Sequence, residues 1–287
     1  MKGLLLAGGT GSRLHPLTKV TSKHLLPVYN KPMIYYSLSV LMLAGVRDIL
    51  LVSTPRDIPR YQELLGNGSQ WGIDLSYIQQ EQPRGIVDAM LQCKHWSNNA
   101  PIWVMLGDNF FHGRNLTCFL EEIRKKPLSS VFTCTVNNPE EFGTVALNTQ
   151  GKPVAFTEKP LSANSSLAVT GLYFYQPSWQ NVAEKMTFSP RGELEISELN
   201  QRLLQYDQIA VNHLANFRWW DLGTPDRIFH LSKCVQEAER QKEEYPGYPE
   251  YAALKQGWIT VEQVEKIIHY SKKSAYGNAL SRLIRAQ

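Results

Sequence analysis

Residues 4–14 read LLLAGGTGSRL, an apolar run that passes directly into three glycines, two hydroxyl side chains and an arginine. An apolar run bounded by a glycine-rich turn is typical of a buried strand. Glycines let backbone N–H groups converge on phosphate oxygens, and the guanidinium of Arg13 adds a planar, charge-assisted contact. The stretch therefore predicts a strand that ends in an anion-binding loop.

Two common phosphate-binding templates do not fit this loop. Reading G-x-G-x-x-G from Gly9 puts Leu14 at the third glycine, and no acidic residue stands about 20 positions onward to hold a ribose. The P-loop pattern G-x-x-x-x-G-K-[ST] is absent as well. A purely structural tight turn stays open on this loop alone.

Short apolar runs alternate with helical periodicity on either side of the loop. The expected strands are 2–7, 49–53, 75–79, 102–106 and 131–136. The expected helices between them are 33–43, 61–65, 87–96 and 116–124. Continuous apolar strands separated by helices predict an α/β fold with a Rossmann-like, mostly parallel sheet and helices on both faces. Such sheets bind ligands at the carboxyl ends of their strands.

The pattern changes near residue 140. Three β-like runs at 144–147, 153–157 and 167–175 crowd together, and helices are expected near 196–205 and 225–240. We therefore expect a core of residues 1–240, with one half at about 1–140 and a second half at about 141–240 that carries a smaller mixed-sheet insertion. Residues 241–287 predict a helical C-terminal tail, with a linker at 246–249 and a helix capped by Thr260.

Composition excludes several classes of protein. The 30 basic and 26 acidic residues leave a net charge of +4, and the longest basic run is only 124–126, so no nucleic acid is expected as a partner. The longest apolar run, 40–46, is too short to span a membrane, and no signal peptide is recognised, so we expect a cytoplasmic protein. The four cysteines are scattered without CxxC spacing, which favours reduced thiols over zinc or disulfides.

The segments around the loop carry a more specific pattern. Residues 6–18 read LAGGTGSRLHPLT and residues 22–32 read SKHLLPVYNKP. This pattern resembles the sugar-1-phosphate nucleotidyltransferases, and within that family it is most similar to the short thymidylyltransferases, over residues 1 to about 280. The resemblance implies transfer of a nucleotidyl group from dTTP to glucose 1-phosphate, giving dTDP-glucose and pyrophosphate, with Arg13 and Lys23 as catalytic residues.

The resemblance also implies a nucleotide-binding set. Its members come from the glycine-rich loop and from the segment QEQPRGIVDA at 80–89: Gly8, Gly9, Thr10, Gly11, Ser12, Arg13, Gln80, Gly85 and Asp88. The family usually has glutamine where this chain has Asp88 and aspartate where it has Arg84. Because aspartate only accepts hydrogen bonds, the preference for the base is open, and UTP or another sugar 1-phosphate is an alternative substrate.

Two aspartates are candidate ligands for a metal. Asp108 follows the expected strand 102–106, and Asp221 lies in WWDLGTP at 219–225. Each could instead stabilise a turn or cap a helix. Mg²⁺ prefers a few carboxylate oxygens and keeps other positions for phosphate and water. The resemblance implies that both aspartates bind Mg²⁺.

The sugar-phosphate side draws on residues later in the chain. The resemblance assigns to it Asp108, Gly143, Glu158, Lys159, Val169 and Arg191. One acceptor for hydroxyl groups and two cations for a phosphate dianion suit a hexose 1-phosphate. A solvated surface pair is the alternative for Glu158 and Lys159.

Two further hypotheses concern the whole protein. A non-catalytic nucleotide-sugar sensor is an alternative to an enzyme, although a sensor need not keep Arg13, Lys23 and both aspartates. The tail carries much apolar surface, in Tyr248, Tyr251, Trp258, Ile259, Val264, Ile267, Ile268, Tyr270 and Leu280. This surface must pack on its own chain or on another copy. The resemblance favours a homotetramer.

Overall fold

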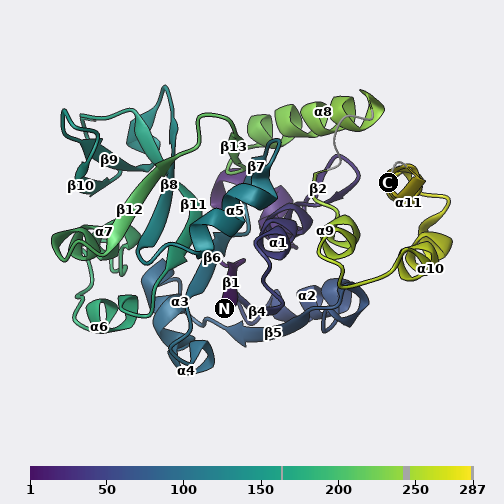
Figure 1. Cartoon of the computed structure of the whole chain (residues 1–287), viewed down its shortest axis with the longest axis horizontal. Helices are drawn as coiled ribbons and strands as arrows, with labels where there is room; N and C mark the ends of the chain where they lie inside the picture. The colour runs from purple at the N-terminus through teal and green to yellow at the C-terminus, as the bar shows by residue number, and fades with distance from the viewer. Residues whose placement is uncertain (163, 242–245, 286–287) are drawn as a thin grey trace.

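The computed structural model describes residues 1–162, 164–241 and 246–285 (Figure 1). A nine-stranded sheet runs through the molecule in the order β10-β9-β11-β6-β1-β4-β5, with β8 beside β11 and β12 beside β8. The parallel strands are β1 (Lys2–Leu6), β4 (Asp48–Ser53), β5 (Asp74–Gln79) and β6 (Ile102–Leu106). Strand β1 lies between β4 and β6 and is parallel to both.

Alternate side chains of β1 pack into two apolar layers, one on each face of the sheet. Leu5 packs with helices α1 (Met33–Leu43), α2 (Ile58–Leu65) and α5 (Leu116–Arg124) on one face. Leu4 and Leu6 pack on the other face, whose helices are α3 (Ile86–Gln92), α4 (Lys94–Ser97), α6 (Trp179–Ala183) and α7 (Ile196–Gln205). Because both faces are covered, the expected α/β class is confirmed.

The second half of the core continues the same sheet with mixed strand directions. Its strands are β8 (Ser129–Thr135), β9 (Gly143–Leu147), β10 (Pro153–Glu158), β11 (Leu167–Tyr175) and β12 (Ile209–His213). Strand β11 is antiparallel to both β6 and β8, while β12 is parallel to β8. The expected strand 131–136 is therefore present, but it joins the sheet through β11 and not beside β6.

Short elements depart most from the expectations. The expected helix 87–96 is divided at Cys93 into α3 and α4, because Cys93 leaves the helical region of backbone space. The two-residue strands β2 (Pro27–Val28) and β3 (Lys31–Pro32), and the pair β7 (Asn109–His112) and β13 (Arg218–Asp221), were not expected. These strands are too short for a periodic pattern to form.

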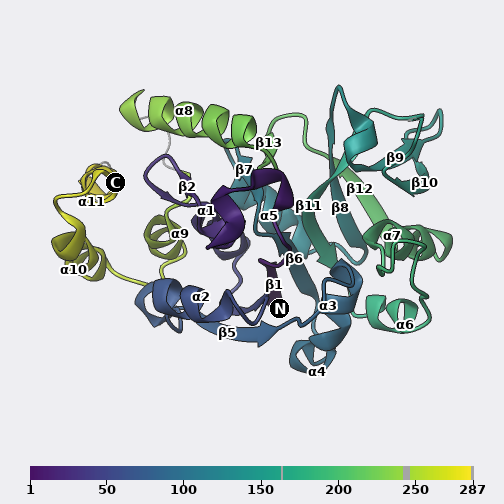
Figure 2. The same cartoon turned by 180° about the vertical axis from the view of Figure 1, so that it is seen from behind.

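The C-terminal helices gather at the end of the molecule opposite β9 and β10 (Figures 1 and 2). They are α8 (Pro225–Gln241), α9 (Pro249–Lys255), α10 (Val261–Ser271) and α11 (Ala275–Arg285). Thr260 caps α10 in a capping box with Gln263, as expected. The expected linker is shorter than 246–249, because Pro249 begins α9.

Much of the tail packs on its own chain. Tyr248, Ala252 and Leu280 belong to the same buried cluster as helix α1. Trp71 donates from Nε1 to Glu250 Oε1 over 3.1 Å. Tyr270 remains 91% exposed. Among the described residues, no helix is long and apolar enough to cross a membrane.

Candidate active site

The glycine-rich loop leaves β1 at its carboxyl end and turns back on itself. Gly11 has φ +60°, and a Cβ there would lie 2.9 Å from Cγ2 of Thr18. Thr18 holds the turn by donating from Oγ1 to the Gly11 carbonyl over 2.8 Å. A larger residue would be strained at Gly11, so the loop needs glycine at this position. The 3-10 turn Ser12–Leu14 follows and carries Arg13.

Two adjoining cavities open at the carboxyl ends of these strands. One, of about 240 Å³, is lined among others by Gly8, Gly9, Lys23, Gln80, Gly85 and Asp108. The other, of about 250 Å³, is lined among others by Arg13, Gly143, Glu158, Lys159, Val169, Arg191 and Asp221. Ile86, Leu106 and Glu193 line both cavities. We call them the loop cavity and the glutamate cavity.

Most of the residues expected at the site therefore lie together. The division differs from the expectation at Arg13, which lines the glutamate cavity, and at Asp108, which lines the loop cavity. Thr10, Gly11, Ser12 and Asp88 are not among the residues that line either cavity. Asp88 lies behind Gln80, to which it is hydrogen-bonded.

Beside the loop cavity, the backbones of two loops lie in close contact. Gly85 has φ +100°, and a Cβ there would lie 2.5 Å from the Leu194 carbonyl oxygen. The Leu194 N–H donates to the Arg84 carbonyl over 2.9 Å. The loop before α3 is thus attached to the loop before α7, which carries Arg191 and Glu193.

Lys23 and Asp108 form an ion pair inside the loop cavity. Asp108 is only 7% exposed, and its Oδ1 also accepts from Asn109 Nδ2 over 3.0 Å. Burial alone would raise the pKa of Asp108, but the Lys23 ammonium outweighs this effect and holds the pKa below its usual value. Asp108 is therefore a carboxylate at neutral pH.

Asp221 is brought to Asp108 by the small antiparallel pair of β7 and β13. Asp221 lies opposite Asn109 in this pair, and the Leu222 N–H donates to the Asp108 carbonyl over 2.9 Å. Burial and the charge of Asp108 raise the pKa of Asp221. Two carboxylates close together repel each other, and Lys23 and Arg227 offset only part of this repulsion, so the pair is suited to binding a further cation.

The two aspartates fit a magnesium ion. Within the described ranges, no group of three or more His, Cys, Asp or Glu side chains could hold a metal. Mg²⁺ commonly needs only one or two carboxylates, because the phosphates of a substrate and water complete its shell. Asp108 and Asp221 meet that requirement.

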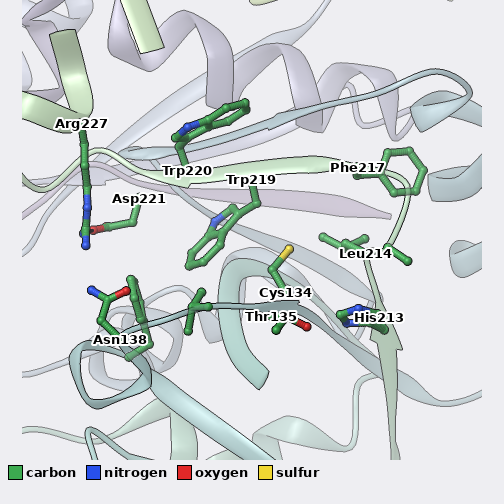
Figure 3. A pocket seen from close by; sticks show the side chains of 13 residues that line it. Cys134, Thr135, Asn138, His213, Leu214, Phe217, Trp219, Trp220, Asp221 and Arg227 are labelled. Atoms are coloured by element: carbon green, nitrogen blue, oxygen red, sulfur yellow. Dashed lines mark hydrogen bonds and ion pairs between the residues drawn. The ribbon is translucent and has the colours of Figure 1, made fainter. Parts of the chain in front are cut away.

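Arg227 was not expected at the site. Its Nη1 donates to Asp221 Oδ2 over 2.8 Å, and its Nη2 donates to Glu141 Oε2 over 2.8 Å. Figure 3 shows Arg227 and Asp221 at one end of a further cavity of about 540 Å³, beside the rings of Trp219 and Trp220. This cavity shares Phe142, Trp219 and Asp221 with the glutamate cavity.

Asn109 organises this part of the site and was missed as a functional residue. Its Oδ1 accepts from the Gly171 N–H over 2.9 Å and from Trp219 Nε1 over 2.6 Å. Its Nδ2 donates to Asp108, as described above. The position directly after Asp108 was the only signal in the sequence.

Glu158 lines the glutamate cavity. It is opposite Gly143 in the β9–β10 pair, and its Oε2 accepts from Ser197 Oγ. A Cβ at Gly143 would lie 3.2 Å from Glu158 Oε2 and 2.9 Å from Ser197 Oγ. The glycine therefore keeps the backbone next to the carboxylate open.

The two cations expected beside Glu158 have different surroundings. Arg191 lies among three carboxylates, those of Glu158, Glu193 and Glu195, at 3.8, 3.1 and 3.4 Å. Lys159 is exposed and adopts φ +39°. Residues other than glycine rarely adopt such a conformation, and it is often found at functional sites.

Comparison with known proteins agrees with this geometry. The profile of the family described as "Nucleotidyl transferase" matches residues 2–238. The chain belongs to this family and is a nucleotidyltransferase.

Similar proteins include the glucose-1-phosphate thymidylyltransferases of two bacteria. That of Xanthomonas campestris pv. campestris (strain B100) is 41% identical over 286 residues, which are 99% of this chain and 97% of that protein. That of Mycolicibacterium smegmatis is 41% identical over 285 residues and 99% of both chains. A solved structure of a candidate glucose-1-phosphate thymidylyltransferase from Bacillus anthracis, in complex with a sucrose, aligns with a TM-score of 0.76 and 34% identity over 83% of this chain and 96% of that one.

Proposed function

We propose that this chain transfers the thymidylyl group of dTTP to glucose 1-phosphate, giving dTDP-glucose and pyrophosphate. The juxtaposition of the two cavities carries the proposal. The loop cavity offers glycine backbone and Lys23 to a nucleoside triphosphate. Among the residues that line the glutamate cavity, Glu158 is an acceptor for sugar hydroxyl groups, and Lys159 and Arg191 are cations for a sugar phosphate. The similarity to full-length thymidylyltransferases supports the choice of substrates.

The reaction needs charge neutralisation and alignment more than covalent chemistry. An oxygen of glucose 1-phosphate attacks the α-phosphorus of dTTP, and pyrophosphate leaves on the opposite side. Lys23 holds the α-phosphate and Arg13 the departing phosphates, so both cations stabilise charge that moves in the transition state. Asp108 and Asp221 hold Mg²⁺, which supplies Lewis-acid neutralisation of the phosphates when bound.

Substrate phosphates compete for cations that are already paired. Lys23 is paired with Asp108 and Arg191 with Glu158, Glu193 and Glu195. Binding of the two phosphorylated substrates with Mg²⁺ exchanges these pairs for phosphate contacts. Glu158, once released from Arg191, accepts hydrogen bonds from sugar hydroxyl groups.

Other substrates and another class remain as alternatives. UTP or a different sugar 1-phosphate would use the same cavities, because Asp88 and Arg84 depart from the family pattern at the base. A nucleotide-sugar sensor would bind the product without releasing pyrophosphate. We also propose a homotetramer in the cytoplasm, regulated by a later product of its pathway.

A pyrophosphate-release panel tests these alternatives together. It crosses dTTP, UTP and CTP with glucose 1-phosphate, galactose 1-phosphate and glucosamine 1-phosphate in the presence of Mg²⁺. We expect the highest kcat/KM for dTTP with glucose 1-phosphate. Binding of nucleotide sugar with no pyrophosphate release from any pair would support the sensor and contradict the enzyme.

A further inference from the structure

Asp88 lies in the first turn of α3, next to Gln80, which lines the loop cavity. Asp88 itself does not line this cavity. We infer that Asp88 is a positioning residue, which fixes the Gln80 amide so that only its carbonyl oxygen is offered to the base. That arrangement selects the pyrimidines with a ring N–H donor, uracil and thymine, over cytosine. The inference rests on the proposed function, in that the loop cavity holds the nucleotide.

The carboxylate of Asp88 is held by three neighbouring polar side chains. Asp88 is 7% exposed, and its Oδ2 accepts from Gln80 Nε2 over 2.9 Å and from Gln92 Nε2 over 2.7 Å. Its Oδ1 lies 3.4 Å from Nη2 of Arg84, whose side chain is half exposed. Each oxygen of the carboxylate is thus used inside the protein.

The chemistry of a carboxylate determines which way the Gln80 amide faces. An ionised carboxylate only accepts, so the NH₂ end of the amide must face Asp88. The same nitrogen also approaches the Gly85 carbonyl at 3.4 Å. Within the described part of the chain, Oε1 of Gln80 makes no hydrogen bond, and Gln80 lines the loop cavity.

A free acceptor on the wall discriminates between pyrimidines at the ring nitrogen N3. Uracil and thymine carry N3–H, which donates to such an oxygen. Cytosine has an unprotonated N3, whose lone pair would face the Gln80 oxygen. An unpaired acceptor facing an acceptor loses the hydrogen bond and adds repulsion, so cytosine is disfavoured.

A purely structural role for Asp88 is the competing explanation. An acidic residue in the first turn of a helix stabilises the helix through its dipole. That role would lower the stability of a variant while leaving the choice of base unchanged. The ratio of affinities for two bases therefore separates the explanations.

The experiment measures binding of dUTP and dCTP to the full chain by calorimetry, without a sugar phosphate. These nucleotides differ only at position 4 and in the protonation of N3. Asp88→Asn can donate as well as accept, so it no longer fixes the orientation of the Gln80 amide and should also reduce the preference for dUTP. Asp88→Leu removes the acceptor and should reduce the preference by about threefold to tenfold, the change expected from one hydrogen bond. Asp88→Ala makes the same test if the leucine variant does not fold.

Two controls isolate the path through Gln80. Arg84→Gln removes the ion pair with Asp88 but leaves the Gln80 contact, and the preference should change less than twofold. In a Gln80→Leu background, Asp88→Leu should have no further effect on the ratio. An unchanged ratio in Asp88→Leu and Asp88→Ala overturns the inference, as does a wild-type protein that binds both nucleotides equally.

These outcomes are distinct from failure of the proposed function. Binding that follows the expected ratios, with no pyrophosphate released from any sugar phosphate, would refute the proposed reaction and support the role of Asp88. Pyrophosphate release from dTTP and glucose 1-phosphate, with the same dUTP-to-dCTP affinity ratio in the Asp88 variants as in the wild type, would support the proposed reaction and refute the role of Asp88.

Discussion

Asp221 lies opposite Asn109 in the antiparallel pair of β7 and β13, and this register places its carboxylate beside that of Asp108. The two aspartates are far apart in the sequence: Asp108 lies between β6 and β7, and Asp221 is the last residue of β13. Their proximity is therefore a property of the short β7–β13 pair. The register of these four residues sets where the carboxylate of Asp221 lies relative to that of Asp108.

The first prediction concerns this pair of carboxylates. Asp108→Asn and Asp221→Asn should each keep the fold but reduce kcat by roughly 100-fold or more, the effect of losing one electrostatic stabiliser. Pyrophosphate release at saturating Mg²⁺ measures the loss, and the unfolding midpoint reports on the fold. Asp48→Asn, which breaks the partly exposed pair with Lys2 far from the cavities, is the control. Full activity in EDTA or in either site variant would contradict the assignment.

A second prediction concerns the contact between the two substrate loops. Gly85→Ala places a methyl group against the Leu194 backbone at positive φ, so it should destabilise the fold by about 1–3 kcal/mol and raise KM for the nucleotide. Gly151→Ala is a matched control, because Gly151 also has positive φ but nothing lies within 4 Å of its Cβ position. The control should cost about 1 kcal/mol with unchanged KM. Equal KM values in both variants would show that the Gly85 contact does not shape the nucleotide site.

A third prediction follows from the buried histidine next to Lys23. Burial is the main reason that the pKa of His24 falls from 6.5 to about 3, with Lys23 adding to the effect. The unfolded chain therefore takes up a proton below pH 6.5 that the folded chain refuses, and stability is lost as pH falls from 6.5 towards 3. His24→Gln should remove about 2 kcal/mol of the loss of unfolding free energy between pH 7 and 5. Parallel stability curves for the variant and the wild type over this range would contradict the burial of a neutral His24.

Long, periodic elements could be predicted from the sequence because their signals are local. The apolar run before Gly8 gave β1 and its loop, and Thr260 gave the start of α10 through its capping box. The grouping of Glu158, Lys159 and Arg191 in one cavity came from the family resemblance, which the sequence carries over nearly its whole length.

The parts that could not be predicted depend on contacts between distant segments. Strands β7 and β13 have four residues each, so periodicity cannot mark them, and Asn109 meets Trp219 only when they pair. Its contact with Gly171 depends on β11, which lies far along the chain. The sequence identified Asp88 as a departure from the family pattern. The hydrogen bond from Gln80 to Asp88 depends on the turn before α3, and the spacing of the two residues in the sequence does not predict it.

The last prediction concerns assembly. Truncation of the tail would be a poor test, because Tyr248 and Leu280 are built into the main core and their loss would unfold the chain. Tyr270 is 91% exposed and Val261 is 40% exposed, both on α10, so they are free to contact a second copy. If α10 is part of a tetramer interface, Tyr270→Ser combined with Val261→Ser should lower the mass measured by light scattering at 10 µM while the unfolding midpoint stays within a few degrees. Phe229→Ser on α8, where Phe229 is 76% exposed, tests the alternative that α8 supplies the interface. A wild-type protein with the mass of one chain would refute the tetramer, and an unchanged tetramer in the α10 variant would exclude this face of the tail.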